Sequence, residues 1–388
     1  MKRSNAIDFA RGLVMIIMAL DHTRDLVCSI TQNPTDLATT TPLLFFTRWI
    51  THLCAPIFVF LSGSSAYLSF SKEKNVPASR RFLLSRGIWL LILECTVVNF
   101  GIFFDLHFRT MFLQVIFAIG ASFIVLSLLL KLSPKTIGII GLVIVLGHNV
   151  FDYVTFPNTI AGNLLSSLVN PVFKPVNESF MFVLMYPVIP WLGIMLIGFA
   201  CGQFFKEQPV EKRKKVFITA GASILTFFII LRFINVYGDP AKWSMQKDAV
   251  YTFLSFMNVT KYAPSLLYTS ATLGIMCFIL YWGEVFSNKI TTIISVYGKV
   301  PMFYYLIHWY ILHTTMLCMM FIQGYKWDQL DFGIFGFGKP KGITAGVGVG
   351  LGGTYIIWMS VVIVLYPLCK RYSVYKDKHR ENKWLRYL

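Results

Sequence analysis

The first apolar stretch of the chain, residues 7–27, contains ionisable residues whose spacing could support acid–base chemistry. Arg11 stands near its start and His22 near its end. Residues eleven apart in an α-helix are separated by three turns plus about 20°, so these two side chains share one face, roughly 16 Å apart along the axis. An imidazole exchanges protons near neutral pH, and Asp25 or Asp21, both close to His22 in the sequence, could orient it. We therefore expect His22 to act as a general base.

Later apolar stretches add candidates of the same kind. His52 lies in one of them, and His308 lies in another with Tyr304 one helical turn before it. Ionisable residues inside a membrane span are costly and usually functional, although Glu94 could equally form a structural buried pair. We expect a catalytic group of His22, Asp25, His52 and His308, and acceptor-binding residues at Asp21, Arg24, Arg48, Glu94 and Tyr304.

Cations near the opposite ends of these stretches form a second pattern. Arg11, Arg86 and Lys299 could together bind a phosphate-rich cofactor, because arginine pairs with phosphate in a bidentate manner. A glycine follows each of the two arginines and would let a ligand or a second helix approach closely. Snorkelling to lipid headgroups is the alternative, and it is the preferred interpretation for Arg80 and Arg81.

Composition identifies the elements that must position these groups. The 388 residues are 56% hydrophobic and only 14% charged, which is typical of a polytopic membrane protein. The net charge of +17 follows from lysine and arginine in short segments between apolar runs, so we expect no nucleic-acid partner. Seven single cysteines and isolated histidines form no metal-ligand spacing, so we expect no metal.

The hydropathy pattern predicts an all-α bundle of about ten transmembrane helices in a single domain, residues 1–388. Cation-rich connections fall on the side of the N-terminus, so both termini are expected in the cytoplasm. Six of the seven histidines then lie toward the outer side, which indicates a shared polar cavity there. The predicted spans are 7–27, 43–70, 83–104, 112–131, 136–153, 181–205, 216–237, 260–282, 291–318 and 350–370.

Several segments resemble the bacterial membrane proteins grouped with heparan-alpha-glucosaminide N-acetyltransferase. The similarity is carried by IDFARGLVMIIMALDHTRD, TRWITHLCAPIFVFLSGSSAYL, RGIWLLILE, YPVIPWLGIMLIGFACG, LSFMNVTKYAPSLLYTSATLG and YGKVPMFYYLIHWYILH, and it runs through nearly the whole chain. The spacing from Arg11 to His22 is also similar to that of first-helix residues in bacterial acyltransferases that O-acylate envelope sugars.

The resemblance implies transfer of an acetyl or other acyl group from cytoplasmic acetyl-CoA to a hydroxyl or amine of an extracytoplasmic sugar. One departure concerns the catalytic histidine, which in the lysosomal enzyme of this group lies in the loop after the first span. The corresponding segment here, residues 28–42, contains no histidine. The role is therefore reassigned to His22 or His52, and either proton abstraction or an acyl-histidine intermediate is compatible with the sequence.

The expected partners are acetyl-CoA, an envelope glycan or sugar and membrane lipids, in a bacterial cytoplasmic membrane, with a homodimer left open. A proton-coupled transporter that uses Glu94 and the histidines as a relay is the rival function. The lack of a visible internal repeat and the cations on the cytoplasmic side disfavour it. A glycan-binding sensor without turnover is less favoured, because it would not need those cations.

Overall fold

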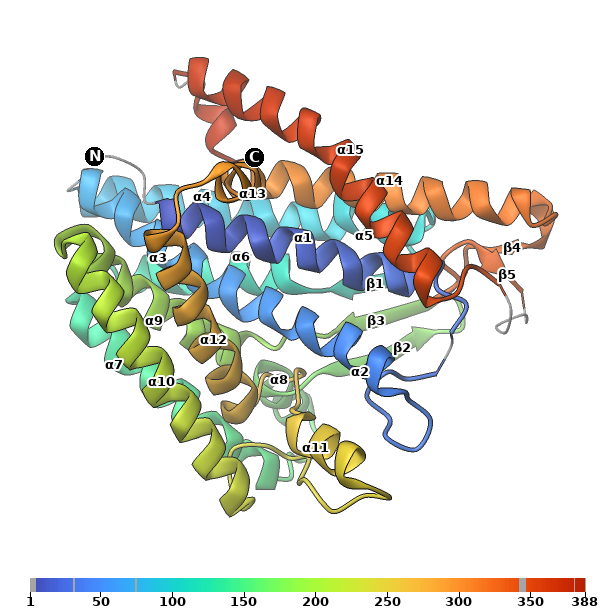
Figure 1. Ribbon diagram of the computed structural model, residues 1–388, viewed down its shortest axis with the longest axis horizontal. Coiled ribbons are helices and arrows are strands. Elements are labelled where there is room, and N and C mark those ends of the chain that lie inside the picture. Colours follow the sequence, from blue (N-terminus) through green and yellow to red (C-terminus); the bar gives the residue numbers. More distant parts are fainter. Residues whose placement is uncertain (1–4, 31, 74, 342–346, 380, 388) are drawn as a thin grey trace.

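A computed structural model of the chain describes residues 5–30, 32–73, 75–341, 347–379 and 381–387. Within these residues the chain is a bundle of helices around α1 (Asn5–Val27), which crosses the middle of the molecule in Figure 1. Eight helical segments are long and apolar enough to cross a membrane. They are Pro42–Glu73, Val76–Phe103, Pro134–Tyr153, Val188–Glu207, Val210–Ile234, Leu266–Val285, Pro301–Ile322 and Leu351–Lys378.

Several of these segments combine regular and irregular turns. The first joins α2 (Pro42–Trp49), the 3-10 turn η1 (Ile50–Leu53) and α3 (Cys54–Glu73), and the second joins α4 (Val76–Leu93), the π-helical turn η2 (Glu94–Val98) and α5 (Asn99–Phe103). The third joins α7 (Pro134–Gly147) and η3 (His148–Tyr153). The remaining long helices are α9 (Val188–Glu207), α10 (Val210–Ile234), α12 (Leu266–Val285), α14 (Pro301–Ile322) and α15 (Leu351–Lys378).

Two predicted spans fall outside the set of eight for identifiable reasons. α1 carries too many charged side chains for an ordinary lipid-facing helix, and most of its residues are buried by neighbouring helices. α6 (Val115–Leu129) is shorter than the other spans because the start of the predicted span, 112–131, is a strand. The all-α membrane fold is confirmed, and both α1 and α6 pack against the long helices.

The predicted span 291–318 is wrong in its boundaries. The chain there forms two helices, α13 (Lys289–Lys299) and α14, separated at Val300 where Pro301 begins the second helix. Proline has no backbone N–H and suits the first turn of a helix, so a new helix starts at this point. α14 alone is long enough to span a membrane, and α13 is a short helix that packs on α1 (Figure 1).

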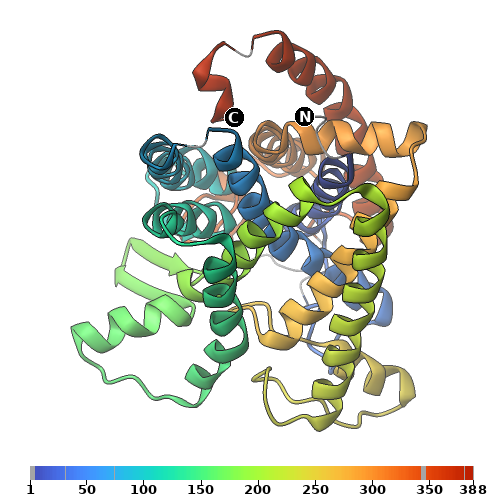
Figure 2. The same ribbon diagram turned by 90° about the vertical axis from the view of Figure 1, so that its left-hand side faces the viewer.

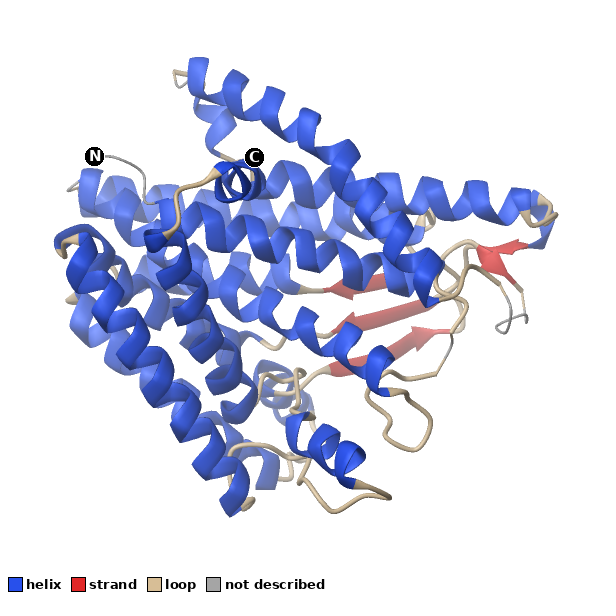
Figure 3. Cartoon of the chain, viewed as in Figure 1, coloured by secondary structure: helices blue, strands red, loops and turns tan. Residues whose placement is uncertain are grey.

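The described residues also form small sheets and short helices. β1 (Thr110–Leu113) pairs in parallel with β3 (Phe180–Leu184), which pairs antiparallel with β2 (Val172–Asn177). β4 (Leu330–Asp331) pairs with β5 (Lys339–Pro340), and in Figure 3 all the strands lie toward one end of the bundle. The remaining short elements are α8 (Ile160–Val169), α11 (Ala249–Met257), η4 (Trp327–Gln329) and η5 (Lys383–Arg386).

Close helix contacts depend on glycine at particular positions. A Cβ on Gly87 of α4 would lie 2.6 Å from the carbonyl oxygen of Gly120 in α6, and a Cβ on Gly120 would lie 2.8 Å from that of Gly87. Gly12 of α1 similarly contacts the carbonyl of Ile294 in α13. The glycines after Arg11 and Arg86 therefore let a second helix approach, which was one of the two predicted explanations.

Candidate active site

A pair of histidines from distant helices forms the centre of the candidate site. The Nδ1 atom of His22 in α1 lies 2.7 Å from the Nε2 atom of His308 in α14. The His22 ring also stacks on Trp309, with ring centroids 4.0 Å apart and planes 19° apart. His22 is partly exposed, whereas His308 has an exposed fraction of 0%. Of the two rings, that of His22 is therefore the one open to a reactant.

The hydrogen bonds around this pair assign its protons. The Nδ1 atom of His308 lies 3.2 Å from the carbonyl oxygen of Tyr304, which can only accept a hydrogen bond. Nδ1 of His308 must then carry a proton, so its Nε2 is the acceptor in the neutral ring and Nδ1 of His22 donates to it. This arrangement leaves the lone pair of a neutral His22 on Nε2, which is the atom that a general base requires.

The expected orientation of His22 by Asp25 or Asp21 is wrong. The Asp25 carboxylate, 55% exposed, accepts a hydrogen bond from Arg24 at 2.6 Å. Asp21 lies 2.7 Å from Arg24 and 3.7 Å from Arg48. Carboxylates pair most strongly with such nearby guanidinium groups, and the imidazole is left to His308.

A lysine that the sequence analysis did not single out completes this ion cluster. Lys261 is buried, and its Nζ atom lies 3.9 Å from the carboxylate of Asp21. It stands in the loop that precedes α12, within a segment that carried the family resemblance. Its role depends on a contact between residues 240 positions apart (261 − 21), which no local pattern reveals.

His52 lies beside this cluster, and it is buried. Its Nδ1 atom is 3.3 Å from the carbonyl of Arg48, and its ring lies 5.3 Å from that of Tyr268. The Tyr268 hydroxyl donates to the backbone carbonyl of His52 at 2.8 Å. These contacts attach the turn η1, which carries His52, to α12.

The six histidines that were predicted to share one cavity do not lie together. His313 stacks face to face on Phe104 at 3.8 Å, and the ring of His148 contacts the carbonyl of Pro264 at 2.8 Å. His107 is exposed in the loop before β1. Only the group formed by His22, His308 and the neighbouring His52 remains as a candidate site.

Glu94 has a different partner from the one expected. Its carboxylate accepts a hydrogen bond from the backbone N–H of Gln114 at 2.6 Å, at the N-terminal end of α6, and no cation or histidine is paired with it in the part of the chain that the structure describes. The neighbouring Asn99 bonds both backbone groups of Phe112. Glu94 therefore attaches β1 and α6 to the π-helical turn η2, and the expectation that it binds the acceptor is replaced by this structural role.

Tyr304 lies where the sequence spacing placed it. Its ring stacks near that of His308 with centroids 5.7 Å apart, and the residue is fully buried. The Tyr297 ring of α13 meets it edge-on at 5.4 Å. Tyr304 consequently supports His308 through its ring and its backbone carbonyl.

The three cations expected to bind a phosphate-rich cofactor occupy two neighbourhoods. Arg11 donates to the Ser65 hydroxyl at 2.8 Å and to the carbonyl of Gly298 at 3.2 Å, which places it next to the Lys299 end of α13. Arg86 lies over the ring of Phe123 in α6, 5.9 Å from its centroid. These contacts join Arg11 to the segment of Lys299 and join Arg86 to α6.

A further lysine contacts the C-terminal end of α1. Lys339 of β5 donates to the backbone carbonyl of Asp25 at 3.0 Å. Burial lowers the pKa of the Lys339 ammonium below its usual value, and the negative charge of Asp25 opposes this shift. The β4–β5 loop is therefore held against the helix turn that carries His22.

A comparison with known protein families finds a match to the first part of the chain. Residues 3–233 match the sequence profile described as heparan-alpha-glucosaminide N-acetyltransferase, catalytic. No curated protein sequence matches the chain significantly. The matched region includes His22, Asp21, Arg48 and His52, whereas His308 lies beyond it. Because the match covers more than half of the 388 residues, the protein belongs to the heparan-alpha-glucosaminide N-acetyltransferase catalytic family, whose members are transmembrane acetyltransferases that act on glycans.

Proposed function

We propose that the protein transfers an acetyl group from cytoplasmic acetyl-CoA to an amine or hydroxyl of an extracytoplasmic sugar, in a bacterial cytoplasmic membrane. The observation that carries this proposal is the directed hydrogen bond from His22 to His308, which presents Nε2 of His22 as a base. The family match favours acetyl transfer over the proton-coupled transporter. N-acetylation is the reaction of the family, and the chemistry of a histidine base suits a hydroxyl acceptor as well.

In the proposed reaction His22 removes the proton from the acceptor as the acceptor nitrogen or oxygen attacks the thioester carbonyl. The new bond to carbon forms first, the carbon–sulfur bond then breaks, and the CoA thiolate takes the proton back from the imidazolium. His308 positions His22 throughout, because its protonated Nδ1 is bound to the Tyr304 carbonyl and its Nε2 can only accept. A route through an acetyl-histidine would use the same Nε2 atom as nucleophile.

Two groups of cationic residues are proposed to bind the two substrates, one group for acetyl-CoA and the other for the acceptor. Arg11, Arg86 and Lys299 are proposed to bind the phosphates of acetyl-CoA. The Trp309 ring, which stacks on that of His22, forms an apolar wall beside it. The Asp21 carboxylate is surrounded by three positively charged side chains, those of Arg24, Arg48 and Lys261. Because the positive charges exceed the single negative charge of Asp21, this cluster can bind an electronegative oxygen of the acceptor or of the reacting carbonyl.

The experiment that tests the proposal is CoA release by the purified full-length protein in detergent. We expect free CoA to appear from acetyl-CoA only when an amino sugar or a hydroxyl-bearing sugar is added, with the acetyl group recovered on that sugar by mass spectrometry. A panel of glucosamine-terminated and neutral sugars identifies the acceptor. Uptake of a sugar into proteoliposomes without CoA release would instead support the transporter.

A further inference from the structure

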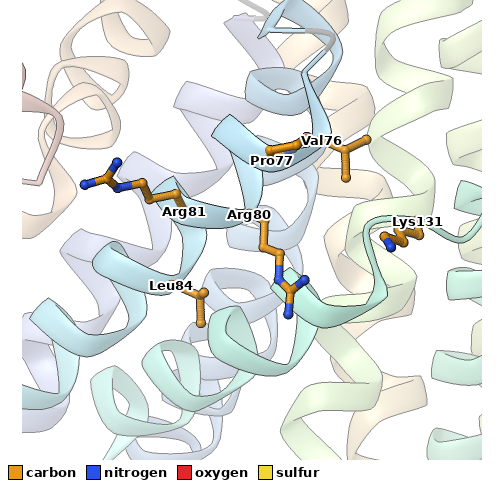
Figure 4. Close-up of a pocket in the computed structure, with 6 residues that line it drawn as sticks. All are labelled: Val76, Pro77, Arg80, Arg81, Leu84 and Lys131. Carbon is orange, nitrogen blue, oxygen red and sulfur yellow. The ribbon is translucent and has the colours of Figure 1, made fainter.

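A basic pocket lies at the N-terminal end of α4, the end expected on the cytoplasmic side, and none of its lining residues belongs to the candidate site. It has a volume of about 660 Å³ and is lined by Val76, Pro77, Arg80, Arg81, Leu84 and Lys131. Arg80 extends from the second turn of α4, and Lys131 lies in the connection between α6 and α7 (Figure 4). None of the six lining residues carries a negative charge, whereas three of them carry a positive one.

The pocket opens beside the close contact between α4 and α6. The two helices touch at Gly87 and Gly120, and the pocket lies on the N-terminal side of that contact in α4. Figure 4 shows the guanidinium of Arg80 directed toward the neighbouring helix, whereas Arg81 extends away on the other side of α4. Arg80 and Lys131 can therefore act on one ligand, and Arg81 contributes mainly its aliphatic stem.

Exposed apolar side chains lead from this pocket along the helices. Leu84, Ile88 and Ile92 follow one another at intervals of four residues, so they share one face of α4. Ile88 is 51% exposed and Ile92 is 50% exposed, and Leu128, one turn before Lys131 on α6, is 56% exposed. A water-soluble phosphate would gain nothing from this apolar track, whereas an acyl chain would cover it.

We propose that this pocket binds the phosphate of an anionic phospholipid, with the phosphate between Arg80 and Lys131 and an acyl chain along Leu84, Ile88 and Ile92. The site is independent of acetyl transfer, because none of its residues belongs to the proposed catalytic or acetyl-CoA-binding groups. Basic pockets between transmembrane helices on the cytoplasmic side are suited to anionic headgroups, at about 1 kcal/mol for each lysine or arginine. Bound lipid would cover the α4–α6 contact.

Native mass spectrometry of the full-length protein in neutral detergent tests this proposal. Phosphatidylglycerol and phosphatidylcholine are titrated separately, and we expect preferential retention of phosphatidylglycerol. Arg80→Gln and Lys131→Gln should each weaken phosphatidylglycerol binding about fivefold, which corresponds to ~1 kcal/mol. Arg81→Gln, the matched control on the same helix, should retain nearly full binding.

Three results would overturn the assignment. Equal retention of both lipids would remove the charge recognition, and equal losses in all three variants would show an unspecific surface effect. In a third experiment, inorganic phosphate and CoA are titrated in place of the lipid. If Arg80→Gln weakens binding of either one while phosphatidylglycerol binding is unchanged, the pocket recognises a soluble phosphate. The thermal midpoint of each variant, measured in lipid-free detergent, checks that these exposed substitutions leave the protein folded.

Discussion

The proposed chemistry rests on two imidazole rings, that of the partly exposed His22 and that of the buried His308. His22 is accessible and donates through Nδ1, whereas His308 is enclosed and is fixed by the Tyr304 carbonyl. Asp21 and Asp25 instead pair with cations. Imidazole thus takes the orienting place that a carboxylate often has beside a catalytic histidine.

If His22 is the general base, His22→Ala should lower the rate of acetyl transfer by about 10² to 10⁴ while acetyl-CoA binding is retained. His308→Ala should cause a smaller loss of about 10 to 10², because it removes only the positioning bond. Steady-state CoA release measures the rate of acetyl transfer, and calorimetry with CoA measures binding. His379→Ala, directly after the end of α15, serves as the control and should leave turnover unchanged. Normal turnover in His22→Ala together with loss in His52→Ala would transfer the role to the second histidine.

Arg11→Ala and Arg86→Ala should weaken CoA binding, since each removes a charge-assisted contact of about 1.5 to 3 kcal/mol. Calorimetry on the detergent-solubilised variants measures this change directly. Arg81→Ala, which removes an exposed cation from the same helix as Arg86, is the control. Unchanged affinity in both test variants would contradict the proposed binding of phosphates by these residues.

Lys261 is proposed to act on the acceptor, because it completes the cluster around Asp21 on the side opposite the proposed CoA phosphates. Lys261→Gln should raise the KM for the sugar acceptor about fivefold to tenfold while the KM for acetyl-CoA stays within twofold. Initial rates at varied concentrations of each substrate separate these values. Lys242→Gln, on the same outer loop region but exposed, is the matched control. An equal rise in both KM values would show a general structural effect.

At the scale of elements, glycine determines how closely the helices carrying these residues approach one another. α4 and α6 meet through Gly87 and Gly120, and α1 meets α13 through Gly12. Glu94 then ties η2 to the start of α6 through the N–H of Gln114. Shifts at these contacts would displace the helices that hold the arginines.

Gly120→Ala should destabilise the fold, because its Cβ would lie 2.8 Å from the Gly87 carbonyl and 3.1 Å from the Leu90 Cβ. Overpacking of this kind costs about 1 to 3 kcal/mol. The thermal midpoint in detergent is expected to fall accordingly. Gly352→Ala in α15, where nothing lies within 4 Å, should leave the midpoint unchanged or raise it, since alanine favours helix by about 1 kcal/mol. Equal midpoints for the two variants would contradict the packing argument.

For the whole molecule, both termini lie at the same end of the bundle in Figure 1. The chain also returns on itself there, since Tyr387 hydrogen-bonds Ser85 of α4 at 2.8 Å, and Figure 2 shows the last segment turning back beneath α15. This arrangement agrees with an even number of crossings. The cytoplasmic location of this end remains a prediction from the distribution of cations.

A reporter enzyme that is active only outside the cytoplasm should give no signal when it is fused to the C-terminus. The same reporter inserted after Glu178, in the β2–β3 turn, should be active, because that turn belongs to the opposite end of the bundle. Reporter activity in whole cells is the measurement, and immunoblotting checks equal expression. Activity at the C-terminus would mean that the bundle is inserted in the opposite orientation, which would place His22 and His308 on a different side from the proposed acceptor.

The sequence by itself determined the membrane class, the approximate position of the eight long apolar segments and the shared face of Arg11 and His22. These properties follow from hydropathy and from the fixed period of the α-helix, which are local. The break of the predicted span at Val300 was also marked locally, by Pro301, although hydropathy alone joined the two parts.

Only the tertiary structure decided which polar groups meet. The bond between His22 and His308 joins residues 286 positions apart, and the approach of Lys261 to Asp21 depends on how α12 and its preceding loop pack against α1. Asp25 lies about one helical turn after His22, yet its carboxylate forms an ion pair with Arg24. Helix period fixes the direction of a side chain, but the partner that it finds depends on the packing of the other helices, and that packing is set by contacts distributed over the whole chain.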